Sequence, residues 1–199
     1  MLLIRLVDLL LSFIGAVILS PIFLVIAICI KLNSNGHVFY RQIRVGKHNK
    51  DFMLYKFRSM NMDADKKGLL TVGGNDSRIT TVGLFLRKYK LDELPQIFNV
   101  LKGEMSLVGP RPEVRKYVDL YNEEQMKVLS VLPGITDYAS IKFRNENNLL
   151  VKAEDPDQFY IDAIMPEKIK LNEKYINNQN ILQYIKVVFL TIIRIFRKE

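Results

Sequence analysis

The sequence predicts an α+β fold: one membrane-associated domain with a short β-hairpin and several amphipathic helices. Three observations support this. An apolar stretch without charged residues runs from Leu9 to Ile30, alternating segments flank Gly46, and helical patterns follow from Thr80 onward. A chain of 199 residues is expected to form one domain. We expect it to comprise a membrane helix (1–32), a water-exposed body (33–178) and an amphipathic C-terminal helix (179–199).

The chain is basic. Its formal net charge of +8 and pI near 9.5 indicate an acidic partner, which is a phosphate compound, a nucleic acid or an anionic membrane. The single cysteine, Cys29, lies within the apolar stretch, so no disulfide framework exists and the body is expected in a reducing compartment. His37 and His48 have no partner at a metal-ligand spacing and are expected at the surface.

The apolar stretch is long enough to cross the hydrocarbon core of a bilayer as a helix. A signal peptide is the first alternative because Arg5 precedes it. Against that alternative, Asp8 interrupts the charged end, the stretch is too long, and no small-residue cleavage site follows. We therefore expect a membrane helix that is retained.

Ser20-Pro21 lies in the middle of this helix. Proline removes a backbone hydrogen bond and clashes with the preceding turn, so a bend is expected there. Basic residues flank the stretch on both sides, and positive charge marks the cytoplasmic side of a membrane segment. A kinked helix that spans the bilayer and a re-entrant hairpin that returns to the same side both remain open on this basis.

A second apolar-rich stretch runs from Ile181 to Arg197. Polar residues recur on one side of it, while the apolar ones cover the other: Gln183, Lys186, Arg194 and Arg197 against Ile185, Val188, Phe189, Ile192 and Phe196. This pattern is typical of an amphipathic helix in the membrane interface, with its basic face toward anionic head groups. A core helix with extended basic side chains is the alternative.

Two extended segments, His37–Arg44 and Phe52–Phe57, are joined by the turn-like residues 46–49 and predict a β-hairpin. Continued alternation would put Lys56 and Arg58 on one face, where two cations could hold a diphosphate. A solvated edge strand is the alternative.

Asp63-Ala64-Asp65 resembles the acidic motif with which many nucleotide-sugar transferases hold a metal ion. Lysines follow it at once and no strand precedes it, so an exposed polar helical turn is the better interpretation. Residues 68–76 form a loop containing Gly73-Gly74 that lacks the spacing of a phosphate-binding fingerprint.

Two adjacent carboxylates, Asp92 and Glu93, are the central feature of the body. Thr80 or Thr81 caps a predicted helix that ends near Lys90, and Pro95 fits the first turn of a new helix that starts at Asp92 and stops at Gly103. Such a pair is most often a helix cap, because carboxylates complement the positive end of the helix dipole.

Stiff turns carrying cations favour a different role for this pair. Pro110 and Pro112 fix the backbone around Arg111, so its guanidinium is presented with little conformational freedom. A second stiff turn, Pro133-Gly134-Ile135-Thr136, leads to a strand predicted to end near Lys142 and Arg144. Together with the basic residues just before Asp92, these cations predict an anion-binding site.

These segments together resemble the bacterial sugar transferase family, the small monotopic phosphoglycosyl transferases that start glycan assembly on polyprenyl phosphate. The resemblance extends in order over residues 1–144, and its central block is long and specific. The matching segments are Ser20-Pro21, Lys56-Phe57-Arg58-Ser59-Met60, Asp76-Ser77-Arg78-Ile79-Thr80, Leu91-Asp92-Glu93-Leu94-Pro95-Gln96, the block from Asn99 through Gly109-Pro110-Arg111-Pro112, and Pro133-Gly134-Ile135-Thr136.

The resemblance implies that Asp92 is the nucleophile and that Glu93 is its partner, with Mg²⁺ held by the two carboxylates. Ser20-Pro21 matches the break of the family's re-entrant helix. The expected fold is therefore a monotopic domain whose helix-break-helix enters and leaves the bilayer on one side. The phosphate and nucleotide site would be lined by Lys56, Arg58, Arg87, Arg111 and Arg144.

The reaction implied is the transfer of a sugar-1-phosphate from a UDP-sugar to polyprenyl (undecaprenyl) phosphate. Asp92 would attack the β-phosphorus, release UMP and form an aspartyl-phosphosugar, which the lipid phosphate would then attack in a ping-pong scheme. This would be the first membrane step of capsule, O-antigen, exopolysaccharide or glycoprotein assembly. The expected location is the bacterial inner (cytoplasmic) membrane, with the catalytic body on the cytoplasmic face, and a homodimer is left open.

Two departures and two alternatives remain. Members commonly have Gly and then Gln after the second turn, where this chain has Asp137 and Ser140, and Asn-Gly-Arg where it has Lys142-Phe143-Arg144. The chain from Asn145 onward matches least, so we expect sugar choice to depend partly on it.

A direct-transfer glycosyltransferase is one alternative function. With Asp63 and Asp65 on a metal ion, it would release UDP. The other alternative is a non-enzymatic basic module that binds nucleic acid or anionic lipid. It would give Asp92 and Glu93 no role, so we expect no nucleic-acid partner.

Overall fold

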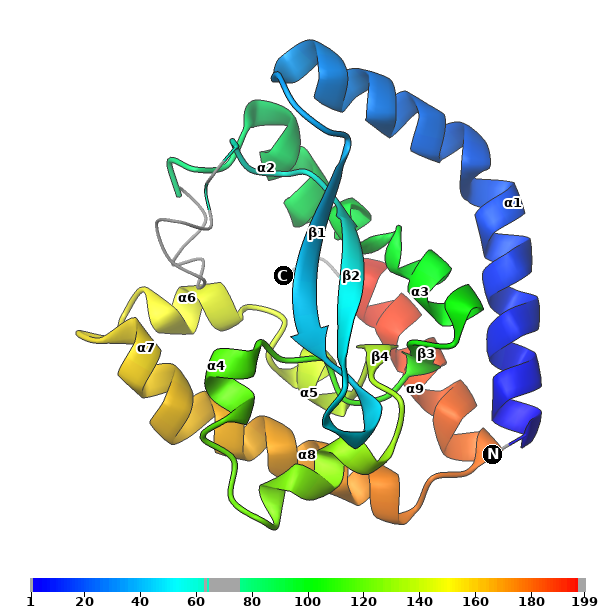
Figure 1. The fold of residues 1–199 in the computed structure, drawn as a ribbon, viewed down its shortest axis with the longest axis vertical. Coiled ribbons are helices and arrows are strands. Elements are labelled where there is room, and N and C mark those ends of the chain that lie inside the picture. Colours follow the sequence, from blue (N-terminus) through cyan, green and yellow to red (C-terminus); the bar gives the residue numbers. More distant parts are fainter. Residues whose placement is uncertain (1, 63, 65–75, 197–199) are drawn as a thin grey trace.

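The computed structural model describes residues 2–62, 64 and 76–196, which fold into a mixed arrangement of helices and short strands (Figure 1). The strands are β1 (Phe39–Val45), β2 (Asp51–Phe57), β3 (Ser106–Val108) and β4 (Gly134–Thr136). The helices are α1 (Leu2–Asn33), α2 (Thr81–Lys88), α3 (Gln96–Lys102), α4 (Arg115–Val118), α5 (Tyr138–Lys142), α6 (Glu146–Leu150), α7 (Pro156–Phe159), α8 (Met165–Asn177) and α9 (Ile181–Phe196).

Helix α1 is one continuous, curved helix that follows the side of the body, where a helix-break-helix was expected (Figure 1). Pro21 lies inside it and has no N–H for the carbonyl of Val17. The hydroxyl of Ser20 donates to that carbonyl instead, at 2.8 Å. This substitution explains how the helix continues through the proline with a bend and without a break.

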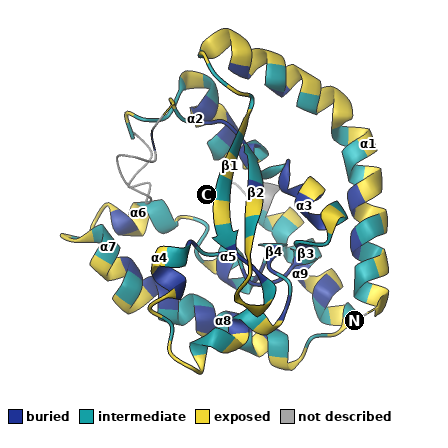
Figure 2. Ribbon diagram, in the orientation of Figure 1, coloured by how far each residue is buried: buried dark blue, intermediate teal, exposed yellow. Residues whose placement is uncertain are grey.

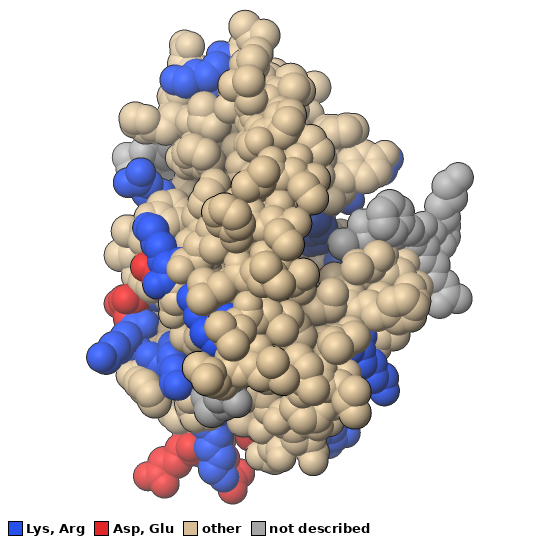
Figure 3. Space-filling view, turned by 90° about the vertical axis from the view of Figure 1, so that its right-hand side faces the viewer, with Lys and Arg blue, Asp and Glu red and all other residues tan. Residues whose placement is uncertain are grey.

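The two sides of α1 differ sharply in exposure (Figure 2). The side facing the body buries Asp8, Ser12, Ile26 and Ile30. The other side exposes large apolar residues along the whole helix, among them Leu10, Phe13, Ile18, Leu24 and Val25. Helix α1 is long and apolar enough to cross a membrane. Viewed from the α1 side, the middle of the surface is almost free of charged residues, and Lys and Arg lie toward its edges (Figure 3).

The hairpin predicted from the alternation is confirmed. Strands β1 and β2 pair antiparallel, with Val45 opposite Asp51 and Tyr40 opposite Lys56. The residues between the strands turn tightly, and His48 and Asn49 both have positive φ angles. β2 ends at Phe57, so Arg58 lies beyond the strand and the alternation does not extend to it.

Strands β3 and β4 form a second, parallel pair, in which Ser106 lies opposite Gly134 and Val108 opposite Thr136. This pairing brings the two proline turns together. At Gly134 a side chain would meet the backbone nitrogen of Gly109 at 2.0 Å, so the close approach requires glycine.

The segment around the acidic pair differs from the expectation. Thr80 caps α2 by accepting from the N–H of Gly83, as predicted, but no α-helix starts at Asp92. Lys90 adopts a left-handed conformation (φ 58°), residues Leu91–Glu93 form a single 3-10 turn, and α3 begins at Gln96. The reason is that Lys90 reverses the chain and Pro95 can only precede or open the next helix. Helix α3 ends at Gly103, as predicted.

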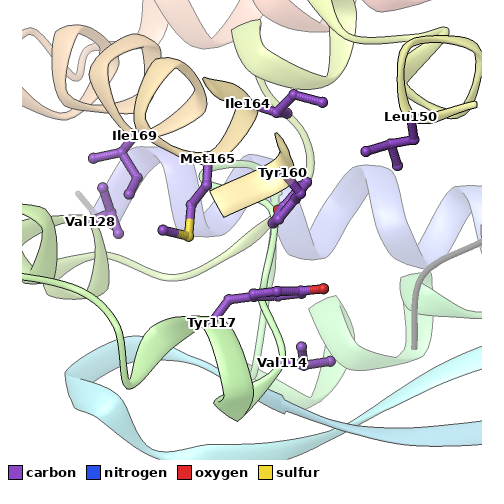
Figure 4. Packing of buried hydrophobic residues seen from close by; sticks show 8 residues of the cluster. All are labelled: Val114, Tyr117, Val128, Leu150, Tyr160, Ile164, Met165 and Ile169. Atoms are coloured by element: carbon purple, nitrogen blue, oxygen red, sulfur yellow. The ribbon is translucent and has the colours of Figure 1, made fainter. Parts of the chain in front are cut away.

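The C-terminal third packs as a layer of helices on the body. Its core contains residues of α4, α6, α8 and the segments between them (Figure 4): Val114, Tyr117, Val128, Leu150, Tyr160, Ile164, Met165 and Ile169. Helix α9 buries Tyr184 and Val187 against the body and exposes Leu182, Ile185 and Phe189 on its other side. It therefore combines the two interpretations of the sequence pattern: part core helix, part exposed apolar face. Arg197 lies outside the described residues.

Candidate active site

Asp92 and Glu93 occupy the 3-10 turn between α2 and α3. An apolar cluster packs against this turn. Leu91 and Leu94, on either side of the pair, pack against a cluster that includes Ile30 of α1. The turn directs the two carboxylates differently: Asp92 is buried, with 6% of its surface exposed, and Glu93 reaches a group of cations. Helix α1 and the turn that carries the acidic pair thus pack in one apolar cluster.

Glu93 is held by two of the cations that the sequence predicted for the site. Arg111 makes a bidentate pair with it: one guanidinium nitrogen donates to Oε1 and the other to Oε2, the latter at 3.1 Å. Lys56 on β2 donates to Oε1 at 3.4 Å. Three segments far apart in the chain therefore meet at this carboxylate, and a bidentate arginine fixes its orientation.

Arg111 is itself positioned by a residue that the sequence analysis treated as a departure. The side chain of Asp137 accepts from the backbone N–H of Arg111 at 3.2 Å and from that of Ser140 at 2.5 Å. Asp137 thus caps α5 and holds the proline turn at the same time. The parallel pairing of β3 and β4 brings these groups together.

The local charges move the pKa values of the two carboxyls in opposite directions. Burial raises the pKa of Asp92, and the negative charge of Glu93 adds to the effect. Burial also opposes ionisation of Glu93, but Arg111 and Lys56 together outweigh it and hold its pKa well below the ordinary value. Burial lowers the pKa of Lys56 to about 8.

One carboxylate oxygen of the pair lacks a partner. Oδ1 of Asp92 is buried and has no hydrogen-bond partner among residues 2–62, 64 and 76–196. Buried polar atoms are almost always paired, so an unpaired one requires an explanation, and a catalytic role or a bound ion is one such explanation. The described part of the chain contains no group of three or more residues of the kinds His, Cys, Asp and Glu that could enclose a metal ion. Asp63 and Asp65 lie outside it.

The remaining predicted cations are divided between the site and the scaffold. Arg87 of α2 acts electrostatically on Asp92, and no hydrogen-bond or ion-pair partner for its side chain is found in the described part of the chain. Arg58 donates to the carbonyls of Ser34 and Asn35 after α1, at 2.7 and 2.8 Å, so it closes the end of that helix. The guanidinium of Arg144 donates to a carbonyl of α9. The structure therefore brings Lys56, Arg87 and Arg111 together but not Arg58 or Arg144.

A cavity of about 160 Å³ opens beside these residues. Arg87 and Arg111 line one part of it; elsewhere it is lined by Arg44, Glu113, Glu146, Asn147, Tyr160 and Lys168. Sequence reasoning missed all six of these residues. Arg44 stood in a predicted strand and Glu113 directly follows the stiff turn, so both had a signal, whereas nothing local marks the others.

Comparisons with known proteins identify the family of this chain. The sequence matches the family model described as bacterial sugar transferase over residues 1–198. It is 41% identical over 188 residues to "UDP-N-acetylgalactosamine-undecaprenyl-phosphate N-acetylgalactosaminephosphotransferase" of Aeromonas hydrophila, covering 93% of this chain and 41% of the relative. It is 38% identical over 196 residues to "UDP-glucose:undecaprenyl-phosphate glucose-1-phosphate transferase" of Klebsiella pneumoniae, covering 96% and 40%.

A third relative is of similar length to this chain. The "Uncharacterized sugar transferase EpsL" of Bacillus subtilis is 38% identical over 181 residues, covering 90% of this chain and 80% of the relative. The chain spans about two fifths of the length of the first two relatives. The family model covers nearly the whole chain, including the turn with Asp92 and Glu93 and the turn with Arg111. The chain therefore belongs to the bacterial sugar transferase family.

Proposed function

We propose that this protein transfers a sugar-1-phosphate from a UDP-sugar to undecaprenyl phosphate and releases UMP, as the first membrane step of surface glycan assembly. Two relatives carry names that describe sugar-phosphate transfer to undecaprenyl phosphate. The observation that carries the proposal is the buried, unpartnered oxygen of Asp92 beside a carboxylate that already pairs with Arg111 and Lys56. Such an oxygen is available as a nucleophile.

The proposed reaction has two steps at one phosphorus atom. In the first, an oxygen of ionised Asp92 bonds to the β-phosphorus, and the bond to the bridging oxygen breaks, so that UMP leaves with both bonding electrons. In the second, an oxygen of the lipid phosphate attacks the aspartyl-phosphosugar, and the Asp92 carboxylate leaves. Each step has an anionic nucleophile and a single leaving group, so donor and acceptor react in turn in a ping-pong scheme.

The cations of the site would offset the electrostatic repulsion between the Asp92 carboxylate and the diphosphate of the donor. Arg87 is a half-buried cation next to Asp92 whose side chain has no partner in the described ranges, so it can bind a phosphate directly. Lys56 and Arg111 hold Glu93 and also keep the site positive. Arg58 and Arg144 stay predicted substrate contacts, and each would have to exchange its present acceptors for phosphate oxygens.

Mg²⁺ is the proposed cofactor. The residues present fit it, because Mg²⁺ is commonly held by one or two carboxylates together with substrate phosphates, and Asp92 offers an unpartnered oxygen. Asp92 and Glu93 would hold the ion with the phosphates of the donor, and Glu93 would have to exchange a contact with Arg111 or Lys56 for the ion. When bound, it supplies positive charge that offsets the charge of the diphosphate.

The contacts of α1 support a re-entrant, monotopic attachment to the membrane. Near its start, Arg5 donates to the carbonyl of Met105, at 3.3 Å, and Asp8 accepts from the backbone N–H of Leu107. Near its end, Ile26 and Ile30 belong to the same buried cluster as Phe57 and Leu86 of the body. With the body on one side of the bilayer, a helix whose two ends both contact that body would have both ends on that side.

The exposed apolar faces of α1 and α9 would then enter one leaflet, which places the acidic pair near the lipid head groups. Positive charge near membrane segments marks the cytoplasmic side. We therefore propose that the protein lies on the inner (cytoplasmic) membrane with its catalytic body on the cytoplasmic face.

Two measurements test the function. With undecaprenyl phosphate and a panel of UDP-sugars, the released nucleotide should be UMP; release of UDP would indicate direct glycosyl transfer instead. Without the lipid, a UDP-sugar labelled in the sugar should leave a labelled adduct on the protein. The adduct should be absent from Asp92→Asn and present in the matched exchange Asp119→Asn, at an exposed carboxylate of the body. Full adduct formation by Asp92→Asn would remove Asp92 from the nucleophile role.

A further inference from the structure

We propose that the cavity beside Arg87 and Arg111 receives the sugar of the donor, and that Glu146 and Lys168 in its lining select which sugar is accepted. This inference rests on the proposed function and specifies its substrate recognition. It assigns a role to the C-terminal third of the chain, where α6 and α8 contribute these two residues.

The position of the cavity relative to the acidic pair is the first argument. Arg111 lines the cavity and simultaneously makes the bidentate pair with Glu93. Arg87 also lines it and acts electrostatically on Asp92. A phosphate bound between these two arginines would therefore lie at the junction of the nucleophile and the cavity, and the group attached to that phosphate can extend into the cavity.

The chemistry of the lining favours a sugar over the uracil base. Bases bind best on exposed aromatic faces. The two aromatic residues of the lining, Tyr117 and Tyr160, are each only 2% exposed and pack against one another in the core, with ring centroids 4.8 Å apart (Figure 4). Beside the apolar Val114 and Leu150, carboxylate, ammonium and amide groups line the cavity toward α6 and α8, and these polar groups match the donors and acceptors of sugar hydroxyls.

Glu146 and Lys168 are held in place by contacts that would let them discriminate among donor sugars. They form an ion pair at 2.5 Å, and their side chains are 22% and 13% exposed. Lys168 also donates to the hydroxyl of Tyr160 at 3.4 Å, and that hydroxyl bonds to Glu113 beside the Arg111 turn. The pair is thus fixed at the Lys168 end, while Glu146 stands on the short helix α6.

A hydroxyl of the correct sugar would take one hydrogen bond from this pair. A site built to bond a hydroxyl rejects an analogue that leaves its polar groups unpaired, which is how a small difference between epimers becomes a large difference in rate. Removing the charge of Glu146 should therefore weaken the preference among sugars more than it weakens binding of the nucleotide.

The test compares UMP release by the full chain from UDP-glucose, UDP-galactose, UDP-N-acetylglucosamine and UDP-N-acetylgalactosamine. For Glu146→Gln and for Lys168→Gln, the ratio of kcat/KM between the best and second donor should change by about 10-fold, the effect of one lost hydrogen bond. The inhibition constant of UMP, which has no sugar, should stay within about twofold. Glu167→Gln is the matched control, because Glu167 pairs with Lys142 at 2.5 Å on the exposed surface, away from the cavity lining.

Three results would overturn parts of this picture. Unchanged donor ratios in both variants would refute the sugar pocket. A parallel rise in the UMP inhibition constant and in KM for every donor would assign the cavity to the nucleotide instead. No UMP from any UDP-sugar with the wild-type chain would refute the proposed function itself. If a charge variant does not fold, Asn147→Ala makes the same comparison, because Asn147 lines the cavity and leaves the ion pair intact.

Discussion

Arg111 grips both carboxylate oxygens of Glu93, 18 positions away in the chain. The contact joins the turn after β3 to the turn before α3, while Asp137 holds the backbone of Arg111 from the other side. Glu93 is thereby ionised and oriented, and it adds its negative charge to the surroundings of Asp92, whose pKa it helps to raise. Substitution of Glu93, Arg111 or Asp137 should therefore change the electrostatic environment of Asp92, the proposed nucleophile.

Arg111→Lys should lower kcat/KM for the donor by about 30-fold. Lysine keeps the charge but cannot make two parallel bonds to one carboxylate, so one charge-assisted hydrogen bond, about 2 kcal/mol, is lost. UMP release under single-turnover conditions measures the effect. Arg115→Lys is the matched control, since Arg115 forms an exposed pair with Asp51 on the same turn region. An equal loss in both variants would show that the effect is not specific to the Glu93 contact.

Lys56 should set the alkaline limit of activity. Its pKa is lowered to about 8 by burial, so the side chain is charged below pH 8 and neutral above it. As pH rises through 8, Glu93 loses one of its cations and the site loses positive charge, so kcat/KM for the donor should fall. In Lys56→Arg the cation persists, and the fall near pH 8 should disappear, whatever the absolute rate. Lys102→Arg, at an exposed position, should keep the wild-type limit.

The two carboxylates should respond oppositely when their charges are removed. Because the pKa of Asp92 is raised, its ionised form destabilises the folded protein. Asp92→Asn should therefore increase the free energy of unfolding by about 1 kcal/mol and raise the unfolding temperature. The lowered pKa of Glu93 means that its ionised form is favoured, so Glu93→Gln should lower it. Both variants should be inactive. Thermal unfolding at pH 7 in one detergent tests the signs; a decrease for both would contradict the raised pKa of Asp92.

Local patterns in the sequence predicted the hairpin, the cap at Thr80 and the stop at Gly103, because each depends on neighbouring residues. The 3-10 turn at Asp92 was missed because it depends on the left-handed conformation of Lys90, a residue type that rarely adopts it. Strand β2 ends one residue before Arg58, and no local signal showed that this guanidinium would turn back to Ser34.

Long-range contacts explain the other differences. The three-residue strands β3 and β4 are too short for a periodic signal, yet their pairing is what brings Asp137 to Arg111. Lys168 reaches the cavity through α8, about 60 positions after Arg111, and only the packing of the C-terminal helices places it there. The residue pattern marked Asp92 and Glu93, and the family resemblance supplied their expected roles. The geometry distinguishes Arg87, at the cavity, from Arg58, at the end of α1.

Asp8 of α1 connects parts of the chain that are far apart in sequence, although the sequence indicated only that it argues against a signal peptide. In the structure it is 1% exposed, and one of its oxygens accepts from the hydroxyl of Ser106 (3.0 Å), the backbone N–H of Leu107 (2.9 Å) and the hydroxyl of Tyr184 (2.7 Å). One carboxylate in α1 thus holds β3, which leads to the Arg111 turn, and α9 as well. Three donors depend on it.

Asp8→Ala should therefore destabilise the protein by about 3 kcal/mol, since it leaves those three donors buried without an acceptor. Tyr184→Phe removes one donor and leaves Asp8 two partners, so it should cost about 1 kcal/mol. Asp8→Asn keeps an acceptor oxygen and should lie between them. Thermal unfolding in nanodiscs, with proteolysis of α9 as a second readout, measures the order. If Asp8→Ala costs no more than Tyr184→Phe, the apolar packing of α1 holds the helix to the body, and the carboxylate does not.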